Sequence, residues 1–256
     1  MSTRVRAVGP QEGHSHTHTI IFLHGRGSNC TEFSAEFLES EASGPVDEPR
    51  TLLDLFPTIR WIFPSAPVMH ASRFECEMSQ WFDMWSTEDP NEKPKLQTRG
   101  LSDSIDSILN VVEQEEALIP CENIFLAGIS QGFAAAFAAY IRGGKGFAGL
   151  IGFCTWIPSA ALVLISEEQG GTYSMPHNRT GGKSTMPVLI EHSKDDAIVP
   201  VAEGRKLYHI LKNTLNVTVA YHEYEDGEHW INEPQGVDDM VAFLHNIITG
   251  EEPLTG

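Results

Sequence analysis

Six short apolar runs are spread along this sequence, and longer segments with helical periodicity lie between them. In these runs nearly every residue is apolar, rather than every second residue, which is typical of strands buried on both faces of a sheet. The runs cover residues 19–23, 61–63, 123–127, 147–153, 187–191 and 217–221. Because such strands occur mainly in parallel sheets covered by helices, the runs predict an α/β fold.

The segments between the runs supply the helices that such a sheet needs. In residues 101–118 the apolar side chains recur with a period of about 3.6 residues, and Pro120 follows the end of the pattern. Further helices are predicted over residues 131–141, 201–215 and 234–248. Strands that alternate with helices imply right-handed βαβ units, so we expect a mostly parallel sheet with helices on both faces. A chain of 256 residues is long enough to form it as a single domain over residues 1–256.

Three segments are predicted to lie outside this core. Residues 1–17 are expected to be a flexible lead, and residues 86–99 and 167–185 are polar stretches with proline or glycine, typical of surface loops or lids. Within the lead, His14, His16 and His18 alternate and would share one strand face, which is compatible with a metal site. We interpret them as a polar approach to the first strand and predict no metal site.

Charge and cysteine usage exclude several functional classes. A net charge of −18 argues against binding to nucleic acid or to an anionic membrane through a basic face. Residues 147–165 carry no charge, but Pro158 interrupts them, so a buried strand, a loop and a short helix are predicted rather than a membrane span. The four cysteines form no CxxC pair, and no signal peptide is recognisable. Free thiols and a cytoplasmic location are therefore expected, while the oligomeric state is not predicted.

The segment Gly128-Ile-Ser-Gln-Gly132 fits the pattern G-x-S-x-G. In that motif a serine stands at a tight, strained turn from strand to helix, and the small residues around it let strand and helix approach closely. Here the pattern follows a predicted strand and opens a predicted helix, as the motif requires. The competing interpretation is a glycine-lined turn with an ordinary helix-capping serine. The context favours Ser130 as a nucleophile.

A serine hydroxyl needs an adjacent base, which a carboxylate in turn orients. His229 is the best candidate for the base, because it lies in a glycine-containing turn between a strand and the last helix, where ligands bind in open α/β folds. For the carboxylate, Asp195 and Asp196 both follow a predicted strand, and their spacing does not separate them. The order serine, aspartate, histidine is the order that such sites use.

A developing oxyanion would be held by two backbone N–H groups. One is that of Gln131, the residue after the nucleophile, at the start of a helix. The other is that of Arg26, which stands between two glycines after the first strand. The alternative for this second position is a glycine-rich strand exit without a function.

Taken together, these pieces resemble the phospholipase/carboxylesterase branch of the α/β-hydrolases, which includes the acyl-protein thioesterases. The matching segments are residues 22–27, 64–67, 81–83, 128–132, 192–200 and 227–229, in one order across residues 19–248. The resemblance implies an α/β-hydrolase fold, selects Asp196 over Asp195, and implies Arg26 and Gln131 as the oxyanion donors. It also implies that Trp81 lies near the acyl or alcohol pocket.

This sequence departs from the family pattern in three places. Phe133 stands where a second glycine is common, Arg26 replaces a residue that is usually apolar in the thioesterases, and the loop 167–185 is longer than expected. A ring at Phe133 would change the helix packing or narrow the site. Trp156 and Trp230 flank the loops of the site, so both are candidate pocket residues alongside Trp81 and Phe133, with core packing as the alternative.

The combined hypothesis is hydrolysis of a carboxylic ester or thioester through an acyl-enzyme, with no cofactor. The expected substrate is a small acyl ester or thioester, with an acylated protein as a second option. The alternative is a non-catalytic binding module on the same fold. Peptidase activity is a weaker option, because the chain lacks room for the accessory domain that many such peptidases carry.

Overall fold

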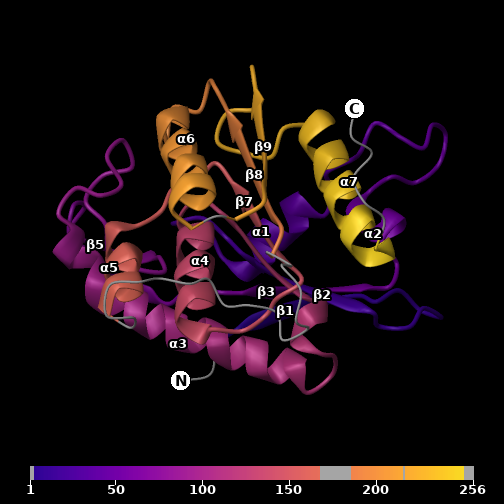
Figure 1. Ribbon diagram of the computed structural model, residues 1–256, viewed down its shortest axis with the longest axis horizontal. Coiled ribbons are helices and arrows are strands. Elements are labelled where there is room, and N and C mark those ends of the chain that lie inside the picture. The colour runs from indigo at the N-terminus through magenta and orange to yellow at the C-terminus, as the bar shows by residue number, and fades with distance from the viewer. Residues whose placement is uncertain (1–2, 168–185, 216, 251–256) are drawn as a thin grey trace.

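A seven-stranded sheet forms the centre of the molecule (Figure 1). The computed structural model describes residues 3–167, 186–215 and 217–250. The strand order is β1-β3-β2-β6-β7-β8-β9, and every neighbouring pair is parallel except β1 with β3. The strands are β1 (Val5–Val8), β2 (His18–Leu23), β3 (Ile59–Pro64), β6 (Ile124–Ile129), β7 (Gly149–Phe153), β8 (Val188–Ser193) and β9 (Val219–Tyr224). The predicted, mostly parallel α/β sheet is therefore confirmed.

Helices cover both faces of the sheet (Figure 1). One face carries α3 (Gln97–Glu116), α4 (Gln131–Gly143), α5 (Ser159–Glu167) and α6 (Val201–His209). The other carries α1 (Cys30–Phe37), α2 (Leu52–Leu55) and α7 (Gln235–Thr249). A short hairpin of β4 (Val68–Ala71) and β5 (Cys76–Ser79) stands apart from the main sheet.

The alternation of side chains along the strands divides the buried residues into two cores. In β2, Ile21 and Leu23 belong to the cluster under α3 and α4, whereas Ile20 and Phe22 belong to the cluster under α1 and α7. Successive side chains of a strand point to opposite faces, so a strand between two helical layers must be apolar throughout. This requirement explains why the strands appear in the sequence as continuous apolar runs.

Two predictions about the segments outside the core were wrong in part. Residues 1–17 are not only a lead, because Val5–Val8 pairs antiparallel with β3 and closes one edge of the sheet. The predicted loop 86–99 is shorter, since a 3₁₀ turn at Pro94–Leu96 leads into α3, which begins at Gln97. Of the predicted loop 167–185, Glu167 ends α5 and residues 168–185 lie outside the described residues.

The boundaries of the other elements differ from the predicted ones only in detail. The helix predicted over 201–215 is α-helical up to His209, and one π-helical turn, Ile210–Thr214, follows it. The uncharged stretch 147–165 contains β7 and most of α5, as predicted. No helix within the described ranges is long and apolar enough to cross a membrane. The four cysteines are free thiols, as expected.

Helix α4 lies unusually close to the sheet because two glycines leave room for it. A Cβ atom on Gly128 would lie 2.3 Å from the Phe133 nitrogen, and one on Gly132 would lie 2.3 Å from the Leu23 carbonyl oxygen. Both contacts are with backbone atoms, which cannot rotate away. The glycines of the motif are therefore required by packing.

We predict that Gly132→Ala lowers the free energy of unfolding by about 1–3 kcal/mol, the usual cost of overpacking. In an exposed helix the same change would stabilise, since alanine has the higher helix propensity. The matched control is Gly143→Ala in the last turn of α4, where the new Cβ would meet only the end of the Leu109 side chain. Urea unfolding of both variants checks the prediction, and equal effects at the two positions would contradict it.

Candidate active site

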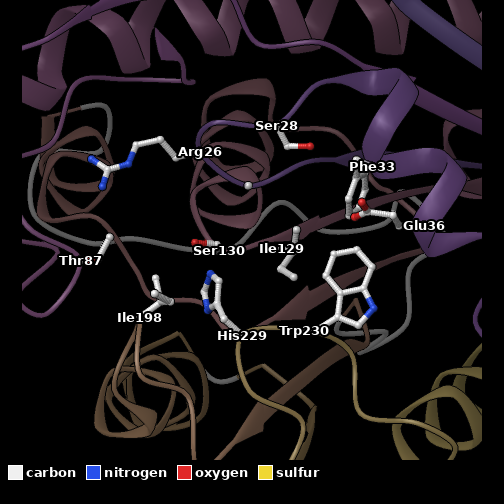
Figure 2. Close-up of a pocket in the computed structure, with 11 residues that line it drawn as sticks. Arg26, Ser28, Phe33, Glu36, Thr87, Ile129, Ser130, Ile198, His229 and Trp230 are labelled. Atoms are coloured by element: carbon white, nitrogen blue, oxygen red, sulfur yellow. The ribbon is translucent and has the colours of Figure 1, made fainter. Parts of the chain in front are cut away.

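Ser130 stands at the turn between β6 and α4 in a strained backbone conformation. Its φ and ψ angles are 56° and −125°, a region that residues other than glycine rarely occupy. Two hydrogen bonds hold this conformation: the Ser130 amide donates to the Phe153 carbonyl, and the Thr155 hydroxyl donates to the Ser130 carbonyl, each over 2.8 Å. The hydroxyl is thereby directed into a cavity above the sheet (Figure 2). This is the strand–serine–helix arrangement that the motif predicts.

The imidazole of His229 and the carboxylate of Asp196 meet beside this serine. Asp196 lies in the loop between β8 and α6, and its Oδ2 accepts a hydrogen bond from His229 Nδ1 over 2.8 Å. Figure 2 shows the imidazole of His229 pointing toward Ser130. The neighbouring Asp195 is exposed and instead accepts a hydrogen bond from the Glu228 amide over 2.9 Å. Of the two aspartates, only Asp196 is placed to orient the histidine.

A second histidine, which the sequence analysis did not single out, also contacts this carboxylate. His192 is fully buried, and its Nε2 lies 3.2 Å from Asp196 Oδ2 and 2.9 Å from the Val199 carbonyl oxygen. Gly204 makes room for the ring, since a Cβ there would lie 2.5 Å from His192 Nδ1. The sequence feature that could have indicated a role for His192 is its position at the end of a predicted strand, four residues before Asp196.

Asp196 is held in its charged form by its surroundings. Burial favours the neutral acid, but hydrogen bonds from His192 and His229 and from the Val199 amide outweigh burial and lower the pKa of Asp196. A second oxygen, Oδ1, accepts from the amides of Ile198 and Val199 over 2.8 Å each. A carboxylate held in this way fixes the orientation and tautomer of the histidine bonded to it.

Asp196 also belongs to a cluster of side chains that could bind a metal ion, and among the described residues it is the only such cluster. The ligand atoms of Cys154, His192 and Asp196 lie within 4.8 Å of one another, and all three residues are buried. Burial, followed by the charge of Asp196, raises the pKa of the Cys154 thiol, so the thiol stays protonated beside this carboxylate. His14, His16 and His18 are not among such clusters in the described part of the chain.

The glycine-rich loop after β2 passes directly beside the serine. A Cβ on Gly25 would lie 3.7 Å from the Ser130 Cβ. The Gly27 amide donates to the Ser79 carbonyl over 2.7 Å, whereas no hydrogen bond of the Arg26 amide to a described backbone acceptor is present. Gln131 is the first residue of α4, where an N–H has no acceptor within the helix. Both amides are thus available for a bound oxyanion, although their role stays a prediction.

Trp81 and the Gln131 side chain hold this loop in place from below. The Trp81 indole donates to the His24 carbonyl over 2.8 Å, and the Trp81 amide donates to Gln131 Oε1 over 2.9 Å. The Gln131 side chain also donates to the Phe82 carbonyl over 2.7 Å. Trp81 is therefore a support of the site and not a part of its wall.

A cavity of about 340 Å³ opens above Ser130 and His229 (Figure 2). Of the four predicted pocket residues, Trp230 lines it, whereas Trp81, Phe133 and Trp156 are buried in the core and do not. The Phe133 ring packs on Gly152, where a Cβ would lie 2.7 Å from it, so the ring changes the helix packing and leaves the site open. The residues that line the cavity are Gly25, Arg26, Ser28, Phe33, Glu36, Thr87, Ile129, Ser130, Ile198, His229 and Trp230.

A comparison with known families agrees with this geometry. Residues 7–248 match the model of the phospholipase/carboxylesterase family. The chain belongs to this family. Family membership supports the hydrolysis of esters or thioesters as the function class, and it does not favour the alternative of a non-catalytic binding module.

Individual relatives are distant but cover most of the chain. An acyl-protein thioesterase 1 of Mycosarcoma maydis is 25% identical and aligns over 95% of this chain and 97% of its own length. A probable carboxylesterase, SOBER1-like, of Arabidopsis thaliana is 27% identical over 84% of this chain and 74% of its own. The crystal structure of Zea mays acyl-protein thioesterase 2 superposes with a TM-score of 0.68 at 22% identity, covering 96% of this chain and 99% of that chain, which shows the shared fold.

We predict a pH-dependent loss of stability in Asp196→Asn. Because the folded-state pKa of Asp196 lies below its unfolded value of about 3.9, its charged form contributes stability above that pH, and the contribution is lost as the pH falls further. The free energy of unfolding should therefore be about 1–3 kcal/mol lower in the variant at pH 7, with a gap that narrows below about pH 4.

Urea unfolding followed by circular dichroism at several pH values measures this gap. Asp195→Asn is the matched control, because that carboxylate is exposed and should cost less than about 1 kcal/mol. A gap for Asp196→Asn that stays constant from pH 7 to pH 3 would show that the carboxylate is not held in its charged form.

Proposed function

We propose that this protein is a serine hydrolase that cleaves carboxylic esters or thioesters through a covalent acyl-enzyme. One observation carries the proposal: His229, bonded to Asp196 over 2.8 Å, faces the cavity into which the strained Ser130 projects. Each side chain comes from a different loop at the same edge of the sheet, and together they supply a nucleophile, a base and an orienting carboxylate.

The chemistry proceeds in two balanced halves. Ser130 Oγ attacks the substrate carbonyl carbon while His229 Nε2 takes the hydroxyl proton, and the Arg26 and Gln131 amides bind the negative oxygen of the tetrahedral intermediate. Collapse of this intermediate breaks the bond to the alcohol or thiol, which leaves with the proton from His229. Water, deprotonated by His229, then attacks the acyl-serine, and His229 returns this proton to Ser130 Oγ as the bond to the serine breaks and the carboxylic acid is released.

The size of the cavity favours small substrates. A volume of about 340 Å³ lies at the lower end of the range of ligand pockets. We therefore place a small acyl ester or thioester first. An acylated protein is the second substrate class, supported by the relatives named as acyl-protein thioesterases. The four free thiols support the further proposal of a cytoplasmic location.

We expect Ser130→Ala and His229→Ala each to lower the turnover of 4-nitrophenyl butyrate by about 10³-fold or more. The nucleophile and the base act as one unit, so the loss of either removes most of the rate enhancement. His222→Ala is the matched control, since that histidine pairs with Asp239 over 3.3 Å and does not line the cavity. It should retain most of the wild-type rate. The rates of the wild type and the three variants are measured by steady-state kinetics at neutral pH.

Labelling with a fluorophosphonate probe separates the enzyme from a silent binding module. The wild type should form a covalent adduct that peptide mass spectrometry locates at Ser130, and Ser130→Ala should form none. An S-acylated peptide, assayed beside 4-nitrophenyl esters of increasing chain length, then distinguishes thioester from ester preference. A wild type that neither labels nor hydrolyses any of these substrates would refute the proposed function.

A further inference from the structure

One charged side chain in the cavity has no role in the chemistry described so far. Arg26 contributes its amide to the proposed oxyanion site, but its half-buried guanidinium also lines the cavity. Its hydrogen bond within the described residues is a long one of 3.4 Å, from Nη1 to the Met84 carbonyl oxygen. No described carboxylate lies within 4.0 Å of it. A positive charge removed from water in this way is costly unless an anion compensates it.

The surroundings hold this guanidinium in place without forming an ion pair with it. It lies 5.3 Å from the centre of the Phe74 ring, and the Arg73 guanidinium lies 5.8 Å from the same ring. The nearby acid, Asp83, raises the pKa of Arg26 through its charge but forms no ion pair with it, and its two oxygens accept hydrogen bonds from the amide and hydroxyl of Ser72. Burial, and next the charge of Arg73, lower the pKa of Arg26, yet a guanidinium remains charged at neutral pH.

The opposite side of the cavity has a different character. Figure 2 shows Arg26 and Thr87 on one side of Ser130, and Phe33, Glu36 and Trp230 on the other. The Phe33 and Trp230 rings pack edge to face with their centres 5.8 Å apart and form an apolar wall. Glu36 also lines this side and is exposed, so its negative charge disfavours an anion there. A bound substrate therefore meets a cation on one side of the nucleophile, and apolar rings with a negative charge on the other.

We propose that Arg26 is a specificity-determining residue that binds an anionic group of the substrate. The preferred ester or thioester would then carry a carboxylate or phosphate on the Arg26 side of its scissile carbonyl and an apolar group on the other. This inference rests on the proposed function, because it narrows the substrate class of the same cavity. The charge belongs either to the acyl group or to the leaving group, and matched substrates distinguish the two.

The test compares substrates of equal shape that differ only in charge. For the acyl group, the pair is mono(4-nitrophenyl) glutarate and the 4-nitrophenyl ester of glutaric acid monoamide. For the leaving group, the pair is 4-acetoxybenzoate and 4-acetoxybenzamide. The readout is the ratio of kcat/KM for the anionic substrate to kcat/KM for its neutral partner, so a general loss of activity cancels. The proteins are the wild type, Arg26→Leu, Arg26→Lys and the control Arg73→Leu, which removes the exposed guanidinium on the same ring.

In the wild type we expect this ratio to exceed one for at least one pair. Arg26→Leu should lower that ratio by about 10- to 100-fold, the usual effect of a hydrogen bond to a charged group. Arg26→Lys should retain part of it, and Arg73→Leu should leave it unchanged. A ratio of one in the wild type, or the same ratio in Arg26→Leu, overturns the inference. Hydrolysis of the neutral substrates that depends on Ser130 leaves the proposed function standing in either case.

Failure of the proposed function gives a different result and still tests Arg26. If the wild type hydrolyses none of the four esters, calorimetry with the stable amides 4-acetamidobenzoate and 4-acetamidobenzamide replaces the kinetics. Tighter binding of the anionic amide that Arg26→Leu abolishes would support an anion site without catalysis. Equal binding of the two amides, or binding that Arg26→Leu does not change, would overturn the site itself.

Discussion

The close contact between α4 and the sheet is the constraint on which the rest of the site depends. Without a Cβ at Gly128 and Gly132, the helix backbone approaches the ends of β2 and β6 at a distance that any side chain would prevent. The chain must then turn from strand to helix within one residue, and Ser130 takes a positive φ as a result. The same approach brings the first amide of α4 next to the loop that follows β2. One packing contact thus positions the nucleophile and both proposed oxyanion donors.

A second constraint converges on Asp196 from the other half of the sheet. Its Oδ2 contacts the His229 and His192 rings, and its Oδ1 accepts hydrogen bonds from two backbone amides. These partners determine both the charge and the orientation of the carboxylate. His192 comes from the end of β8, whereas His229 comes from the turn after β9. Because β8 and β9 are parallel neighbours, their exits lie at one edge of the sheet, which is how a parallel sheet gathers residues distant in sequence.

The fold and the candidate triad follow from patterns that are local in sequence, and the pocket does not. Apolar runs, helical periodicity and G-x-S-x-G depend on neighbours within one element, so the six parallel strands and the turn at Ser130 were predictable, whereas the antiparallel edge strand β1 was not. The choice between Asp195 and Asp196 depends on side-chain direction, and only the family resemblance selected the residue that contacts His229. Trp81 and Trp156 illustrate the limit, because proximity to a catalytic loop in sequence does not reveal which side of that loop a ring occupies.

Two departures from the family pattern show that a substitution can affect either the packing of the core or the lining of the cavity. The ring of Phe133 is compensated inside the molecule, since Gly152 of β7 leaves the space that the ring fills. Its effect therefore ends in the core, as close packing of an apolar side chain requires. The guanidinium of Arg26 is compensated only in part, because Asp83 acts on it through its charge while no described carboxylate forms an ion pair with the cation. The fold therefore supplies no paired anion for the Arg26 guanidinium at the cavity. We expect that anion to come from a molecule bound in the cavity.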